Sequence, residues 1–198
     1  TPHEKGVDLR NNADLLFKLG FDRAREIAGP RALGVLDCEL TDIWRKEGVI
    51  ELYRDDLFRR YSNSIVHDTS PTPLPDHLYP DIWLANISLE EINSLPSDTP
   101  WFFWISFTGP HEPFDVPVSW RGFHGKIPPP EKRPDCLDYL NKCAPEGSVL
   151  SRKLQRWPVG IPLGSVRELR ADYADHIHLL DAQVGRIVRS LEINGFLD

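Results

Sequence analysis

The chain has 198 residues, of which 40% are hydrophobic and 27% are charged, so size and composition predict one folded domain and exclude a disordered or collagen-like chain. It has 23 Lys and Arg against 30 Asp and Glu, a formal net charge of −7, and lacks the basic face that nucleic-acid binding requires. The longest apolar run, residues 101–107, is far shorter than the roughly 20 residues of a membrane-spanning helix, so neither nucleic acid nor a membrane is an expected partner.

Helices dominate the predictions for the first third of the chain. An asparagine cap, an apolar stripe and a glycine stop predict a short helix from Asn11 to Gly20. Residues 21–28 alternate weakly between apolar and polar, which favours a strand. From Leu36 to Ser62 apolar residues recur every three or four positions, with a break at Gly48, so two amphipathic helices in tandem are expected.

The next segments are a connection and a helix. Residues 70–80 contain four prolines, which predicts a surface connection. Residues 79–95 are predicted to be helical, with Pro80 in the first turn. A capping-box pattern at Ser88-x-x-Glu91 indicates a break or restart within this helix.

The best candidate for a strand is residues 101–107, which are aromatic and β-branched and lie between two proline-containing turns. Apolar residues on both faces predict an inner strand of a sheet covered on both sides, and therefore an α/β fold. Residues 109–164 hold ten prolines and only a short predicted helical turn at 137–141. A capping box at Ser165-x-x-Glu168 and helical spacing up to Gly195 predict a long C-terminal amphipathic helix.

His111 is the strongest candidate for a functional side chain. It follows the predicted strand directly, in the sequence Thr108-Gly-Pro-His-Glu-Pro-Phe-Asp115, and α/β proteins bind ligands at that end of an inner strand. A rigidly held imidazole can bind an anion or move a proton. The alternative, a turn histidine that bonds the backbone, is equally open from position alone, and Asp115 is expected to cap the next turn.

The last helix carries a second group of chemically active residues, namely Asp172, Asp175, His176, His178 and Asp181. His176 and His178 point apart on a helix, so only Asp172, Asp175 and His176 could converge on a metal ion. A solvated helix face is the favoured interpretation. Motifs for serine hydrolases, nucleotide binding and zinc proteases are absent from the sequence.

The three cysteines, Cys38, Cys136 and Cys143, are an odd number without a C-x-x-C pair, which argues against a disulfide framework or a cysteine zinc site and leaves only a Cys136–Cys143 bridge open. The chain contains no methionine and stops just after Gly195, so we expect a segment of a longer protein. No signal peptide is predicted, and the compartment stays open between cytoplasmic and exported.

Two stretches together resemble the sulfatase family of the alkaline phosphatase superfamily. Residues 101–115, WFFWISFTGPHEPFD, are similar to its strand ending in a Pro-His-x-Pro turn. Residues 173–195, YADHIHLLDAQVGRIVRSLEING, are similar to its helix with Asp-x-x-x-Gly-Arg followed by Leu-Glu-x-x-Gly. They stand in the family's order and spacing, and we expect the resemblance to span the whole chain.

The resemblance implies a partial alkaline-phosphatase-like α/β layer fold, helix-rich, with residues 1–198 as a single unit in the central part of the catalytic domain. It assigns the family's sulfate contact to His111 and to no other residue here. It also implies calcium and a formylglycine nucleophile in the parent enzyme, whose motifs this sequence lacks. The family's nucleophile lies in a Cys/Ser-x-Pro-x-Arg motif that precedes the Pro-His turn. The only partial match is Cys143-Ala-Pro-Glu-Gly147, which has glycine in place of the arginine and follows the turn, so it is discounted.

The expected function is therefore that of a segment of a sulfuric ester hydrolase, acting on a sulfated small molecule or carbohydrate and inactive alone. Two alternatives stay open. One is a phosphonate or phosphodiester hydrolase of the same superfamily. The other is a non-catalytic binding or structural module, for which unpaired strand edges would favour self-association of the chain.

Overall fold

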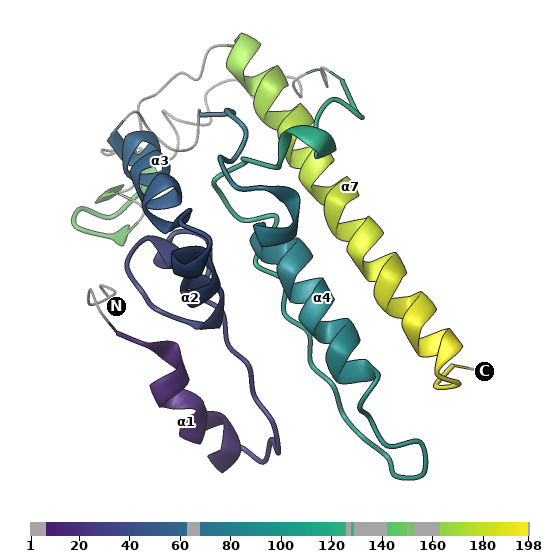
Figure 1. Cartoon of the computed structure of the whole chain (residues 1–198). Helices are drawn as coiled ribbons and strands as arrows, with labels where there is room; N and C mark the ends of the chain where they lie inside the picture. The colour runs from purple at the N-terminus through teal and green to yellow at the C-terminus, as the bar shows by residue number, and fades with distance from the viewer. Residues whose placement is uncertain are drawn as a thin grey trace.

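The computed structural model describes residues 7–62, 68–125, 128, 142–149, 151–152 and 163–197. Within these ranges the chain forms helices joined by turns and extended segments (Figure 1). The α-helices are α1 (Ala13–Lys18), α2 (Glu39–Lys46), α3 (Ile50–Ser62), α4 (Pro80–Ile92) and α7 (Leu163–Ile193). Short 3₁₀ helices are η1 (Leu9–Asn12), η2 (Ala32–Gly34), η4 (Asp76–Leu78) and η5 (Val118–Trp120).

The helices predicted in the first third of the chain are confirmed. Helix α1 is followed by Gly20 at φ +97°, and α2 is separated from α3 by Gly48 at φ +72°, a left-handed conformation that glycine adopts without steric cost. At the start of α2 the Cys38 backbone N–H donates to the Thr41 hydroxyl at 2.8 Å. The predicted strand at residues 21–28 is wrong, because this segment forms no β-ladder with any described residue.

Helix α4 is the centre of the fold. It begins at Pro80, as predicted, and is apolar on nearly every side, which is typical of a helix that is buried all round. One side packs with α2 and α3, and the other with α7. The predicted break at Ser88 does not occur: the Ser88 hydroxyl donates to the Leu84 carbonyl at 2.8 Å, within a continuous helix.

Helices α4 and α7 lie side by side and run in the same direction (Figure 1). Arg186 donates to the Asn86 amide oxygen at 2.7 Å, and Asn194 to that of Asn93 at 3.1 Å, so contacts advance along both helices together. The long C-terminal helix is thus confirmed, although it begins at Leu163 and Ser165 is not its cap. No helix in the described part of the chain has the length and apolar character needed to cross a bilayer.

The predicted inner strand at residues 101–107 is not a strand in this structure. Its backbone groups make no ladder hydrogen bonds with the described residues, and strand structure requires such a neighbour. The chain is nonetheless extended, since Phe103, Ile105 and Phe107 pack on the helices while Phe102 and Trp104 are 77% and 68% exposed. One face is therefore covered instead of the expected two, and the described fold is helix-rich.

The proline-rich connection at residues 70–80 is more buried than the predicted surface connection. Thr72, Leu74 and Leu78 are buried, and the Trp44 indole N–H donates to the Leu78 carbonyl at 2.9 Å. Two other predictions concern residues outside the described part: the helical turn at 137–141, and Cys136 as half of a disulfide. Its proposed partner Cys143 is a free, exposed thiol.

Candidate anion site

The turn carrying His111 lies beside the beginning of α4. After α4 the chain reverses and runs back along it through residues 101–107, which brings Thr108 and Gly109 to Asp81 in the first helical turn. Two cis peptide bonds, Gly109–Pro110 and Glu112–Pro113, bracket His111. The sequence thus places a proline on either side of His111, and the Asp81 side chain binds the turn just before it.

The His111 side chain is 51% exposed. Its Nδ1 atom lies 2.7 Å from the Glu112 carbonyl oxygen and 3.0 Å from the Glu112 carboxylate. Both partners are acceptors, so Nδ1 carries a hydrogen and donates. Glu112 also pairs with Arg31 at 3.0 Å, so the carboxylate beside His111 is countered by a guanidinium.

Asp81 binds the turn directly with one carboxylate oxygen. Oδ1 accepts from the Thr108 backbone N–H at 2.8 Å, the Thr108 hydroxyl at 2.8 Å and the Gly109 N–H at 3.1 Å. Burial opposes ionisation, but the hydrogen bonds from His176, Gly109 and Thr108 hold the pKa of Asp81 below its usual value. The carboxylate is thus an ionised acceptor for the turn's amides.

His176 binds the other Asp81 oxygen. Its Nε2 atom is 3.1 Å from Asp81 Oδ2, and both side chains are 1% exposed. The Tyr79 hydroxyl lies 3.3 Å from the same nitrogen and donates to Asp115 at 3.4 Å. Helices α4 and α7 are joined by this buried polar network at the level of the turn.

Asp115 does not cap an exposed turn as expected. It is buried, its carboxylate faces Tyr79, and its carbonyl accepts from the Thr72 N–H at 2.7 Å. Burial raises the pKa of Asp115 to about 6, although the charge of Arg60 opposes the shift. Of these two buried carboxyl groups, Asp81 therefore has a lowered pKa and Asp115 a raised one.

Asp172 and Asp175 of α7 do not lie on a solvated helix face, as expected, but are buried and hold a loop. Asp172 pairs with Arg121 at 2.8 Å, and Asp175 accepts from the backbone N–H groups of Gly122 and His124 at 2.7 and 3.2 Å. Burial raises the pKa of Asp172, although the bond from Arg121 opposes the shift.

The other two α7 candidates do not join a metal site either. His178 packs against the rings of Trp120 and Phe123, and Asp181 is exposed. No three His, Cys, Asp or Glu side chains among the described residues could together hold a metal ion. The donor set of the described chain therefore does not fit a calcium site.

Next to these contacts is an open pocket of about 300 Å³. It is lined by Arg121, Gly122, Gly125, Glu168, Ala171, Asp172 and Asp175. The loop after His111 and the N-terminal half of α7 thus form the two sides of this open pocket.

Comparison with known families identifies the chain. The family model for sulfatases matches residues 13–198, so the chain belongs to the sulfatase family and the resemblance seen in the sequence is confirmed. Membership implies an α/β fold of the alkaline phosphatase type and hydrolase activity at the family level. A search of curated proteins found no match to this chain.

Sequence reasoning missed Asp81, Tyr79 and the buried Arg60. Asp81 and His176 are 95 residues apart, and no local pattern links them. One signal was present: Asp81 is an acidic residue within the apolar run that follows Pro80, and a carboxylate in a buried helix needs partners.

Proposed function

We propose that this chain is part of a hydrolase of sulfate esters in which the His111 imidazolium contacts a sulfate oxygen. The described residues of the loop after Asp115 help shape the substrate pocket, whereas the end of the stretch assigned to it, up to Arg133, lies outside the described part of the chain. The substrate is a sulfated small molecule or carbohydrate. The observation that carries the proposal is the half-exposed His111 side chain on a fixed, proline-bounded turn within a chain of the sulfatase family.

The protonation of His111 determines what it can bind. Because Nδ1–H donates to Glu112, a neutral imidazole has only a lone pair at Nε2, whereas an imidazolium has an N–H there. A sulfate ester presents only acceptor oxygens at neutral pH. The imidazolium is therefore the form that binds it, through a charge-assisted hydrogen bond from Nε2.

One feature supports an anion at this place, and a second concerns the shape of the substrate pocket. The Arg31–Glu112 pair offsets the nearest negative charge, so an incoming sulfate does not meet an isolated carboxylate. The described part of the following loop lines a pocket against α7, and Asp175 fixes that loop through the Gly122 and His124 backbone amides. A fixed loop beside the turn suits a role in substrate shape recognition.

His111 alone cannot hydrolyse a sulfate ester, because the reaction needs a nucleophile and stabilisation of developing negative charge. Sulfatases generally use formylglycine and calcium for these tasks. We propose that residues 1–198 are the central part of the catalytic domain, with those groups supplied by flanking segments. The isolated chain is then inactive on aryl sulfates.

Reading about a hundred codons on each side of the gene segment tests this arrangement. A Cys/Ser-x-Pro-x-Arg motif upstream with Asp-His-Gly or Asp-Asn-Gly downstream supports it. Stop codons, or flanks without those motifs, contradict it.

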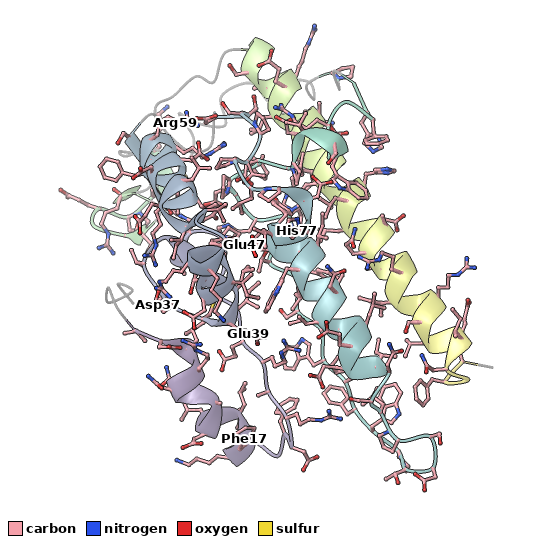
Figure 2. All side chains as sticks on the ribbon, viewed as in Figure 1. Phe17, Asp37, Glu39, Glu47, Arg59 and His77 are labelled. Carbon is pink, nitrogen blue, oxygen red and sulfur yellow. The ribbon has the colours of Figure 1, made fainter. Side chains whose placement is uncertain are left out.

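The anion contact is tested by NMR titration of the chain with inorganic sulfate near neutral pH. The His111 imidazole signals should shift, and His111→Ala should weaken binding by about tenfold, the effect of one charge-assisted hydrogen bond. His77→Ala is the matched control, since His77 is an exposed histidine on η4 (Figure 2). Absence of any shift at His111, or equal binding by His111→Ala, would refute the contact.

A further inference from the structure

We propose that His176 and Asp81 are positioning residues that fix the turn carrying His111. This inference rests on the proposed function, because it assigns second partners to the same anion contact. Neither residue touches the anion. Their role is to hold the backbone of Thr108 and Gly109, so that His111, two residues further along, presents Nε2 in one direction.

The turn depends on Asp81 because three donors converge on one of its oxygens. Two of them are consecutive backbone amides, Thr108 and Gly109, and the third is the Thr108 hydroxyl, all within 3.1 Å of Oδ1. Bonds to an ionised acceptor are stronger than those between neutral groups. Asp81 therefore determines the orientation of the two peptide units that precede Pro110.

Asp81 in turn depends on His176. Its Nε2 is 3.1 Å from Oδ2, while its buried Nδ1 has no hydrogen-bond partner in the described part of the chain. A hydrogen on Nδ1 would be a buried donor without an acceptor, which is costly, so the single hydrogen of the neutral ring lies on Nε2 and points at Asp81. The tautomer and the ring direction are thus fixed by the surroundings.

Gly109 lies directly on this pair. A Cβ atom at residue 109 would stand 2.3 Å from His176 Nε2 and 2.6 Å from Asp81 Oδ2. The turn's backbone and the His176–Asp81 pair are therefore in van der Waals contact as well as hydrogen bonded. A movement of the His176 ring toward the turn would therefore displace Gly109, and with it Pro110 and His111.

The test compares His176→Leu, His176→Gln and a control in the full chain. Leucine removes the donor, whereas glutamine can place an amide N–H where Nε2 stood. Gln183→Leu is the matched control, because Gln183 is a buried polar residue of α7 that bonds the Leu179 carbonyl within its own helix. Three measurements are made: amide exchange at Thr108 and Gly109, the ¹⁵N shift of His111 Nδ1, and sulfate affinity.

His176→Leu should accelerate exchange at both amides by about tenfold, move the His111 Nδ1 signal and weaken sulfate binding, while His176→Gln stays within about twofold of the natural chain. Gln183→Leu should leave all three unchanged even if it lowers the melting temperature. The proposal is overturned if His176→Leu changes the two turn amides and the His111 signal no more than Gln183→Leu does. If the natural chain does not bind sulfate but the turn responds as described, the positioning role stands and the proposed anion contact fails.

Discussion

Gly109 and His176 are in direct contact, with room for no side chain between them: a Cβ at residue 109 would lie 2.3 Å from the His176 Nε2 atom. The requirement for glycine here is steric and does not come from a left-handed backbone. The contact joins the turn carrying His111 to the middle of α7, so that residues far apart in the sequence form one buried unit.

Gly109→Ala should therefore lower the free energy of unfolding by about 1–3 kcal/mol, the usual cost of forcing an extra methyl group into a packed site. Urea denaturation measures the change. Gly185→Ala is the control, since Gly185 is a helical residue of α7 with open space around its Cβ position, and there alanine should stabilise by up to about 1 kcal/mol. Equal stabilities of Gly109→Ala and the natural chain would contradict the contact.

Arg60 is a buried cation that holds the connection between α3 and η4. It is fully buried, pairs with Asp56 at 2.7 Å, and donates to the Ser70 and Pro71 carbonyls at 2.9 and 3.1 Å. Arg60→Met should cost about 3 kcal/mol of stability, because one Asp56 carboxylate oxygen and the Ser70 and Pro71 carbonyls each lose the hydrogen bond from the guanidinium.

The neighbouring Arg59 provides the matched control for that measurement. It binds the same carboxylates, Asp56 and Asp68, but its side chain is 45% exposed (Figure 2). Arg59→Met should cost less than about 1 kcal/mol, since exposed ion pairs contribute little. A smaller loss for Arg60→Met than for Arg59→Met in urea denaturation would disprove the burial argument.

Asp115 makes the stability of the chain depend on pH. Burial raises its folded-state pKa to about 6 from an ordinary value of 3.8, so the folded chain binds more protons than the unfolded chain between these pH values. The stability that this group contributes is present below about pH 4 and is lost as the pH rises through 6.

Asp115→Asn cannot ionise and avoids this loss. Its free energy of unfolding should exceed that of the natural chain by an amount that grows from about pH 4 to pH 7 and reaches about 3 kcal/mol, as a difference of about 2 in pKa implies. Urea denaturation across this range measures it. A difference that stays constant with pH would show that Asp115 is not the titrating group.

The sequence predicts the helices better than the site. The reason is that helix signals lie close together in the sequence, whereas the contacts that build the site join distant residues. Helix α7 and the α2–α3 pair repeat apolar residues at a helical period, and Gly48 marks the break by its left-handed backbone. These signals are local. The prediction of a strand at 101–107 was wrong for the opposite reason, because strand structure depends on a hydrogen-bonded neighbour that the segment does not contain in itself.

The candidate site likewise has one part that the sequence predicts and one part that it does not. His111 stands out because the Gly-Pro and Glu-Pro steps around it are visible in the sequence. The residues that hold its turn, Asp81 and His176, do not stand out in the sequence. They are 95 residues apart and come into contact only once α4 and α7 have packed. The acidic residues of α7 were expected on a solvated helix face, but Asp175 is buried and accepts backbone amides of a loop that is distant in the sequence.

The most direct measurement is the sulfate dissociation constant of the chain as a function of pH, for the natural sequence and for His111→Ala. Since the imidazolium is the binding form, Kd of the natural chain should rise with pH by about tenfold in all and level off near the value for His111→Ala. His111→Ala, which keeps Asp115 and its titration, should bind more weakly at low pH and lose this dependence. A Kd that does not change with pH, or the same pH dependence in His111→Ala, would contradict an anion contact at His111.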